Sequence, residues 1–297
     1  MSSDARTPAD AARTPSGALI LDGNALRDRM VAEIGREVAT LPSTPCLATV
    51  LIGEDRPSQV YVRNKHRQAE RAGMRSRNET LPADVSQHEA EALIVSLAND
   101  SMVSGILVQQ PVPSHLNGEA LLALIPPDKD VDGLTTASMG ALMRGTSSLV
   151  PCTPLGVLRL LQHYGAEIAG KRAVVVGRSS LVGLPLAVLL SRKGVDATVT
   201  LAHSRTTNLV DVCRDADILV SATGQARSIR REHVKPGAWV VDVGISPSAS
   251  GIVGDVAFDE VESIAAAITP MPGGTGPMTV ACLIENTLTA WRQQHAR

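Results

Sequence analysis

Short apolar runs alternate with longer amphipathic segments through the first half of the chain. The apolar runs predict strands at 18–23, 46–53 and 105–111. Amphipathic spacing and capping residues predict four helices between and after these strands. The first is capped by Asn24, and the others span 58–73, 86–98 and 118–125. Gly73 is expected to end its helix in a left-handed conformation. Strands separated by helices are typical of a parallel sheet with right-handed crossovers.

The same pattern restarts at Thr153, so we expect a second α/β domain. Thr153 and Pro154 are typical of a helix start, and that helix is expected to reach Tyr164. The further predicted elements are strands at 172–177, 197–203, 217–224 and 238–244, helices at 181–194 and 207–214, and a final helix from about Thr279. The fold class is therefore two α/β domains, the second one Rossmann-like.

Composition narrows the function classes. The chain has 297 residues, a formal net charge of −2 and only 2% aromatic residues, which disfavours nucleic-acid binding. No apolar stretch approaches the roughly 20 residues of a membrane span. The first 17 residues are polar with no signal-peptide pattern, and we expect a disordered tail there. The four cysteines lack metal-ligand spacing, so neither disulfides nor a metal site is expected, and the cytoplasm is the default compartment.

A strand–turn–helix at 172–194 is the candidate nucleotide site. Gly177, Arg178 and Ser179 follow the strand, and Gly183 lies near the helix start. Backbone N–H groups at such a turn can bind a phosphate. The Gly-x5-Gly spacing departs from the G-x-G-x-x-G pattern of dinucleotide-binding turns. A tight turn without a ligand is therefore as good an interpretation as a nucleotide site. The next strand ends in His203-Ser204-Arg205 without a carboxylate, which favours NADP over NAD, although these could be ordinary solvated residues.

Polar residues in the first half offer further candidates. Tyr61 and Lys65 lie four apart on one predicted helix face. The same spacing occurs in short-chain dehydrogenases, but there it follows the nucleotide turn, so the order excludes that class. A solvated lysine beside a half-buried tyrosine is the plain alternative. Gln109 and Gln110 end an apolar strand, either at a ligand crevice or simply where the strand stops.

Two loops admit both a structural and a functional interpretation. Asp130 and Asp132 in KDVDG are, taken alone, best explained as turn carboxylates. The Gly- and Pro-rich segment 270–279 is either a connector or a stiff loop whose main chain contacts a flat ligand.

Together these segments resemble one family, the bifunctional methylenetetrahydrofolate dehydrogenase/methenyltetrahydrofolate cyclohydrolases. The resemblance begins near residue 18 and is carried by SQVYVRNK (58–65), VQQPVP (108–113), PDKDVDG (127–133), PCTPLG (151–156), GRSSLVGLP (177–185), ATVTLAHSRT (197–206), VVDVGIS (240–246), VGDVAF (253–258) and TPMPGGTGPMT (269–279). It implies NADP-dependent oxidation of 5,10-methylenetetrahydrofolate to the methenyl form, then hydrolysis to 10-formyltetrahydrofolate. It also implies a homodimer that acts in one-carbon metabolism and purine biosynthesis.

The resemblance also assigns roles to residues. Lys65 would be the essential catalytic side chain, with Gln109 hydrogen-bonding it, Tyr61 lining the folate and Asp132 binding the pterin edge. The implied substrate-binding set is Tyr61, Lys65, Val108, Gln109, Gln110, Asp132, Pro272 and Gly273. The implied NADP contacts are Gly177, Arg178, Ser179, Ser204 and Ile245. The catalytic domain would span 18–150, completed by 270–297, and the NADP domain 151–269.

Some positions depart from the family pattern. Gln110 stands where Leu is common, and Ser138 where many members have Asn; Met271 and Thr275 each replace a common Val. Two alternatives follow: a dehydrogenase that has lost hydrolysis, and a non-catalytic binding protein on the same scaffold. A shikimate-type dehydrogenase is disfavoured by the PGGTGPMT and KDVDG segments.

Overall fold

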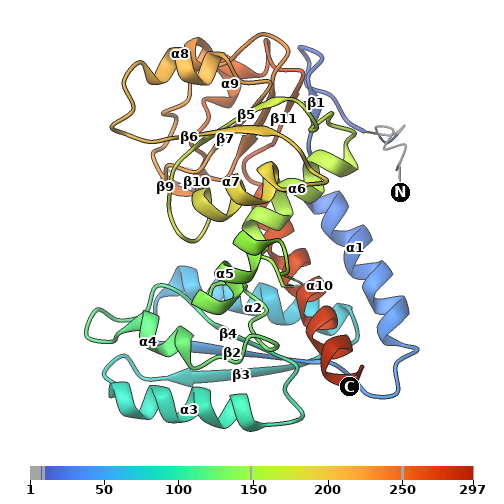
Figure 1. Cartoon of the computed structure of the whole chain (residues 1–297), viewed down its shortest axis with the longest axis vertical. Coiled ribbons are helices and arrows are strands. Elements are labelled where there is room, and N and C mark those ends of the chain that lie inside the picture. Colours follow the sequence, from blue (N-terminus) through green and yellow to red (C-terminus); the bar gives the residue numbers. More distant parts are fainter. Residues whose placement is uncertain (1–7, 9–10, 148, 249–250, 297) are drawn as a thin grey trace. The chain divides into compact units, whose positions relative to one another are not determined.

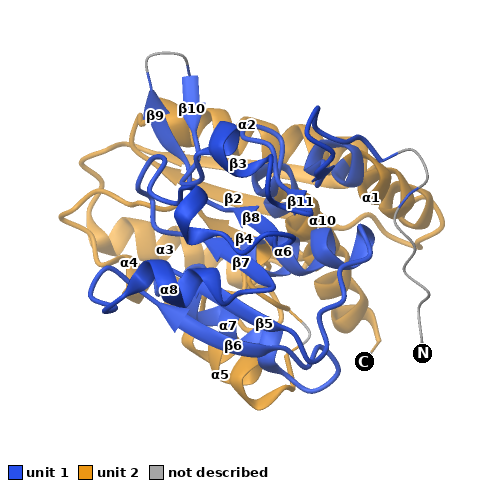
Figure 2. Cartoon of the chain, turned by 90° about the horizontal axis from the view of Figure 1, so that it is seen from above, with its two compact units in different colours: residues 1–27, 153–279 blue, residues 28–152, 280–297 orange. Residues whose placement is uncertain are grey.

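The chain divides into two compact units. The computed structural model describes residues 8, 11–147, 149–248 and 251–296 (Figure 1). Unit 1 comprises residues 1–27 and 153–279, and unit 2 comprises residues 28–152 and 280–297 (Figure 2). Residues 18–27, expected in the first domain, group by contacts with unit 1, because β1 (Leu19–Ile20) pairs with β11 (Ala267–Ile268).

Unit 2 is built on a three-stranded parallel sheet in the order β3-β2-β4. Its central strand, β2 (Cys46–Ile52), is buried along its whole length, as expected for an apolar strand with covered faces. β3 (Arg75–Leu81) is polar and partly exposed at one edge, and β4 (Gly105–Val108) is buried at the other. The helices with more than one residue in unit 2 are α1 (Gly23–Val38), α2 (Arg56–Arg71), α3 (Gln87–Asn99), α4 (Gly118–Ala123), α5 (Thr136–Arg144) and α10 (Thr275–His295).

Unit 1 contains a six-stranded sheet in the order β1-β11-β8-β7-β5-β6, in which every pair of neighbours is parallel. Its remaining strands are β5 (Arg172–Val176), β6 (Thr198–Ala202), β7 (Ile218–Ser221) and β8 (Trp239–Asp242). A separate antiparallel pair is formed by β9 (Ser246–Ser248) and β10 (Gly251–Val253). The other elements are α6 (Cys152–His163), α7 (Gly183–Ser191), α8 (Leu209–Arg214), the short 3-10 helix Arg231–His233 and α9 (Phe258–Val261).

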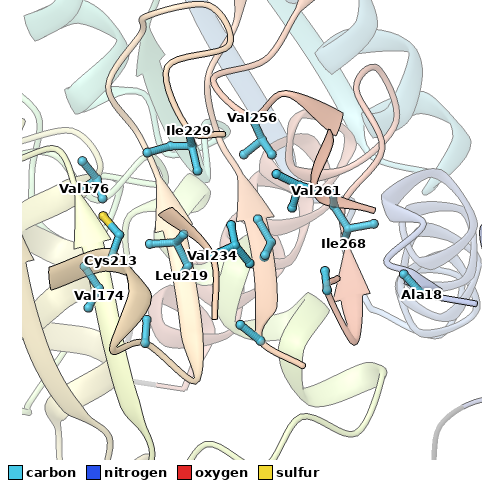
Figure 3. Packing of buried hydrophobic residues seen from close by; sticks show 14 of the residues in the cluster. Ala18, Val174, Val176, Cys213, Leu219, Ile229, Val234, Val256, Val261 and Ile268 are labelled. Atoms are coloured by element: carbon cyan, nitrogen blue, oxygen red, sulfur yellow. The ribbon is translucent and has the colours of Figure 1, made fainter. Parts of the chain in front are cut away.

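An aliphatic cluster on one side of this sheet forms a core of unit 1 (Figure 3). Val174, Leu219 and Val240 come from three neighbouring strands and are almost fully buried. Cys213 from α8 and Val261 from α9 pack against the same cluster. The sheet is thereby fixed as a rigid base, and its strand ends present the candidate ligand residues.

The predicted fold class is confirmed: both units are α/β with parallel sheets, and α10 groups with unit 2 from Val280 to its end at His295. Gly73 has the expected positive φ of 70°. Helix starts were less accurate. Asp22, not Asn24, caps α1, and its carboxylate accepts from the backbone N–H of Asn24 at 2.8 Å. Helix α2 is capped by Asp55 and starts at Arg56, two residues before the expected start.

The expected disordered tail covers residues 1–17, of which 1–7 and 9–10 lie outside the described residues. The rest is hydrogen-bonded to β1, because Ile20 N–H donates to Ala12 O and Thr14 N–H donates to Ala18 O, each at 2.8 Å. The prediction is therefore wrong for residues 11–17.

Candidate active site

Helix α2 places Tyr61 and Lys65 on one face of unit 2. The helix starts where the Asp55 carboxylate accepts from Ser58 N–H at 2.9 Å, with Pro57 in the first turn. Tyr61 is 37% exposed, whereas Lys65 is only 8% exposed. A lysine buried to this degree needs a polar partner, so the plain interpretation of a solvated lysine is wrong.

That partner is Gln109, the first residue after β4. Lys65 Nζ donates to Gln109 Oε1 at 2.9 Å, and Gln109 Nε2 donates to Gln110 O at 2.6 Å. The second bond orients the amide, so an acceptor oxygen faces the lysine. Val108 ends β4 fully buried, and the Gln110 side-chain amide lies beside Gly118 at the start of α4. The two glutamines therefore have different environments.

The KDVDG loop places a carboxyl group near Lys65. Asp130 is buried and accepts from the backbone N–H groups of Gly133, Leu134 and Thr135. For Asp130 the interpretation as a turn carboxylate is therefore confirmed. Asp132, two residues on, is mostly buried, with a small exposed fraction, and interacts electrostatically with Lys65. The loop thus supplies one structural carboxylate and one carboxyl group for the site.

Burial favours the uncharged forms of both Lys65 and Asp132. It lowers the pKa of Lys65 from its ordinary value, although the nearby Asp132 carboxylate acts in the opposite direction. It also raises the pKa of Asp132, against the stabilising charge of Lys65. A neutral amine can accept a proton, which an ammonium cannot, so the site holds a potential base.

Two residues that the sequence analysis did not single out support the Asp132 loop. Asn286 in α10 is 2% exposed, and its Nδ2 donates to Val131 O and Val150 O, both at 2.9 Å. The Cys152 thiol donates to Val131 O at 3.3 Å, and burial raises its pKa well above the ordinary value. Asn286 lies three residues after Leu283, on the apolar face of α10, and a polar residue on that face was the available signal for this role.

Two residues of unit 2 depart from the family pattern, Ser138 and Gln110, and their side chains differ in hydrogen bonding. Thr135 caps α5, accepting from Ser138 N–H at 3.1 Å, and the two hydroxyls are also 3.1 Å apart. Ser138 is therefore part of a helix cap. Gln110 Nε2 is buried and has no hydrogen-bond partner among the described residues.

In unit 1, the candidate cofactor residues gather at the carboxyl edge of the sheet. Gly177, Arg178 and Ser179 follow β5, Ser204 follows β6, and Ile245 lies three residues after β8. Because these strands are parallel, their carboxyl ends share one edge, where ligands bind in open α/β sheets. Arg178, Ser179, Ser204 and Ile245 are all exposed. The residues that the family resemblance assigns to NADP therefore all follow strands of one sheet edge.

The unusual glycine spacing has a steric reason. Gly177 has φ +123°, and a Cβ on it would overlap the backbone carbonyl of Ala222. A Cβ on Gly183, at the start of α7, would overlap the carbonyl of Gly177. The two glycines therefore let strand, turn and helix approach closely, which leaves the N–H groups at the start of α7 beside the turn.

The remaining predicted residues, Pro272 and Gly273, belong to unit 1. Gly273 has φ +114°, and its carbonyl accepts from Gly23 N–H at 2.8 Å. The loop is thus tied to the start of α1.

No helix in the described part of the chain has the length and apolarity to span a membrane. Within the same described ranges, no cluster of His, Cys, Asp and Glu has the arrangement of a metal site. The four cysteines are buried and unbridged.

A parallel sheet with a glycine turn at its carboxyl edge, together with a buried lysine bound by an amide, defines a nucleotide-binding α/β enzyme with a lysine-centred site. Residues 21–132 match the catalytic domain of tetrahydrofolate dehydrogenase/cyclohydrolase, and residues 151–295 match its NAD(P)-binding domain. The chain belongs to this family.

Individual relatives agree over nearly the full length. Bifunctional protein FolD 2 of Frankia alni is 52% identical over 279 residues, which cover 93% of this chain and 96% of that protein. The structure of the Campylobacter jejuni bifunctional enzyme FolD matches with a TM-score of 0.90 at 41% identity, covering 95% of this chain and 100% of that one. A Trypanosoma brucei FolD complexed with NADP cofactor and inhibitor matches with a TM-score of 0.88 at 41% identity, covering 93% and 98%.

Proposed function

We propose that this chain is a bifunctional enzyme that oxidises 5,10-methylenetetrahydrofolate with NADP and hydrolyses the methenyl product to 10-formyltetrahydrofolate. The observation that carries the proposal is the buried Lys65, hydrogen-bonded to Gln109 at 2.9 Å. Family membership and the bifunctional relatives support the two reactions. Folate binding is assigned to unit 2 and NADP binding to unit 1.

Hydrolysis needs a nucleophilic water, and Lys65 is the base that we assign to it. Burial lowers the pKa of Lys65 and so increases the fraction of neutral amine. Gln109 holds this amine without adding a charge that would favour the ammonium form. A cationic methenyl substrate would lower the pKa of the lysine further, because like charges repel.

Binding roles follow the positions of the other residues. Asp132 is assigned to the N–H groups of the pterin edge, and Tyr61 to its ring. Val108 and Gln110 would complete the folate site beside Gln109. For Pro272 and Gly273, which belong to unit 1, contact with the folate rests on the family resemblance alone. The oxidation then depends mainly on positioning, because hydride leaves the bridge carbon as a delocalised cation forms.

The carboxyl edge of the unit 1 sheet fits NADP. The close-packed Gly177 turn and the N–H groups of α7 suit the phosphates, with Arg178 and Ser179 as further contacts. No carboxylate follows β6, where Ser204 and Arg205 are exposed, and this suits a 2′-phosphate. Ile245 is assigned as a further NADP contact. When bound, NADP accepts the hydride.

A dehydrogenase without hydrolase activity is the second candidate, favoured by the buried amide nitrogen of Gln110, which follows Gln109 and finds no hydrogen-bond partner in the described part of the chain. The test supplies 5,10-methylenetetrahydrofolate with NADP or NAD, and follows NADPH or NADH separately from the methenyl species. Methenyl consumed faster than in buffer supports the bifunctional enzyme; methenyl that accumulates at the uncatalysed rate supports the second candidate. No turnover with either cofactor would contradict both.

Assembly and compartment extend the proposal. By resemblance to its family, the chain forms a homodimer, which light scattering coupled to gel filtration would test against a monomer mass of 31.1 kDa. Four buried, unbridged cysteines suit a reducing compartment, so we assign the enzyme to the cytoplasm.

A further inference from the structure

Two buried carboxylates lie at the carboxyl edge of the unit 1 sheet, and the reaction described above does not use them. Asp242 is the last residue of β8 and is 2% exposed, while Asp255 follows β10 and is fully buried. Neither forms an ion pair with a Lys or Arg among the described residues. A buried acid that lacks a cation must be held by other donors.

The Asp255 carboxylate holds the turn that follows β7. Its Oδ2 accepts from Ser221 Oγ at 3.0 Å, from Thr223 N–H at 2.6 Å and from Gly224 N–H at 3.2 Å. Carboxylate–amide bonds of this kind are stronger than neutral ones. The backbone between Ser221 and Gly224 is therefore fixed by a single side chain from a distant segment.

The Asp242 carboxylate holds two other segments in the same way. Oδ1 accepts from Gly244 N–H at 2.9 Å and from Asp255 N–H at 3.0 Å, and Oδ2 accepts from Val256 N–H at 2.9 Å. Asp242 thus connects the turn after β8 to the segment that carries Asp255. The three turns form one hydrogen-bonded assembly.

Glycines make the assembly reciprocal. A Cβ on Gly244 would overlap the carboxylate of Asp255, and a Cβ on Gly254 would overlap the carboxylate of Asp242. Asp255 therefore packs against Gly244, which lies two residues after Asp242. Asp242 packs against Gly254, which directly precedes Asp255. Close approach of this kind leaves the carboxylates little freedom, so the turns that they bind are restrained as well.

These turns adjoin the proposed cofactor site directly. Ala222, inside the segment held by Asp255, is the residue whose carbonyl a Cβ on Gly177 would overlap, and its N–H donates to Val176 O at 2.8 Å. Ile245 follows Gly244, whose N–H is bound by Asp242. One carboxylate thus fixes the wall against which the nucleotide turn packs, and the other fixes the residue before Ile245.

We propose that Asp242 and Asp255 are positioning residues for NADP, which set the 222–224 and 243–245 turns and thereby control the cofactor affinity of the dehydrogenase reaction. The inference rests on the proposed function, because it takes this sheet edge as the NADP site. It assigns neither acid a contact with the reacting atoms. Hydrolysis of methenyltetrahydrofolate consumes no NADP, so the two activities of one protein report on the cofactor site and the lysine site separately.

The experiment compares the wild-type chain with Asp255→Ala and Asp255→Asn. For each protein it measures the NADP Kd by calorimetry and the NADP KM by steady-state kinetics. It also measures methenyl hydrolysis without cofactor, and thermal unfolding. In Asp255→Ala we expect NADP Kd and KM to rise at least about tenfold, since three hydrogen bonds to one turn are lost. Hydrolysis should stay within about twofold of wild type. Asp255→Asn keeps an oxygen acceptor for the turn and should give an intermediate Kd. Asp259→Ala, at an exposed acid of α9 in the same unit, is the matched control and should leave Kd unchanged.

Each outcome decides the inference. A folded Asp255→Ala with wild-type Kd would overturn it. Equal loss of both activities would also overturn it, because the role would then be general stability; Asp255→Asn still allows this comparison if the alanine variant does not fold. If the wild-type chain itself does not bind NADP, the proposed function fails first, and that result is visible before any variant is made.

Discussion

Lys65 Nζ lies 2.9 Å from Gln109 Oε1, and this bond joins the middle of α2 to the end of β4. The lysine is buried, while its hydrogen-bond partner is a neutral amide rather than a carboxylate. The pairing satisfies the amine and leaves burial free to lower its pKa. This arrangement suits an enzyme that uses a neutral lysine as a base.

Lys65→Met should abolish hydrolysis of methenyltetrahydrofolate, with a loss of at least about 100-fold, because no other base is assigned to the water. NADP affinity, measured by calorimetry, should be unchanged, since Lys65 belongs to unit 2 and the cofactor residues to unit 1. Lys171→Met, at a lysine whose partner is the exposed Glu167, is the matched control. Hydrolysis retained in Lys65→Met would contradict the role of this lysine.

Gln109→Glu should change the pH dependence of hydrolysis. A carboxylate in hydrogen-bonding range would raise the pKa of Lys65 and keep it protonated at neutral pH. The rate near pH 7 should fall at least about tenfold and recover as the pH rises toward the new pKa. A pH–rate profile measures this, with Gln162→Glu at an exposed position as the control. An unshifted profile would show that the charge state of Lys65 does not limit the reaction.

Asn286→Ala should affect the folate site through the Asp132 loop. Its amide donates hydrogen bonds to the buried carbonyls of Val131 and Val150, and alanine would leave both carbonyls without this donor. The free energy of unfolding should therefore fall by about 2–3 kcal/mol. Because Val131 directly precedes Asp132, KM for folate should rise in both reactions while NADP Kd stays constant. Urea unfolding and steady-state kinetics measure these quantities, with Gln293→Ala on the same helix as control. Lower stability with an unchanged folate KM would make Asn286 purely structural.

The sequence predicted the elements whose hydrophobic pattern is strong. β2, β5, β7 and β8 are mostly apolar and buried because the faces of their sheets are covered, whereas β6 at the sheet edge alternates threonine with apolar residues; all five were predicted. β3, with the sequence RSRNETL, was missed, because an edge strand with exposed side chains needs no apolar alternation. Helix α5 was missed as well; its cap, Thr135, lies in a loop interpreted only through its aspartates.

The candidate site was accessible from sequence only in part. Strand ends indicated Gln109 and the 177–179 turn, because parallel sheets gather their ligands there. The contact between Lys65 and Gln109 joins residues 44 positions apart, and it depends on how α2 packs on the sheet. No local pattern specifies that packing, so the role of Lys65 came from family resemblance. The Asp242–Asp255 pair acts mainly through backbone groups, which no residue pattern reveals. Asn286 also binds backbone carbonyls, and its only sequence signal was a polar residue on the apolar face of the last helix.

Asp242 should give unfolding an unusual pH dependence. Burial raises its pKa to about 6 in the folded state, above the ordinary 3.8, so the folded chain binds this proton more tightly than the unfolded chain does. The stability contributed by the proton is fully present below pH 4 and is lost as the pH rises through 6, in total about 3 kcal/mol. Asp242→Asn removes this term, so the unfolding free energy of wild type relative to the variant should decrease from pH 4 to pH 7. Urea unfolding at several pH values measures the difference.

Asp259 is the control, because its contribution to stability should change with pH in the opposite direction. Its hydrogen bond with Arg227 holds the pKa of this carboxyl below the ordinary value, so its contribution is present at neutral pH and is lost as the pH falls. The side chain is exposed, and the effect should therefore be small. A wild-type minus Asp242→Asn difference that stays flat between pH 4 and pH 7 would mean that Asp242 ionises normally in the fold. Its three backbone donors would then fully offset its burial.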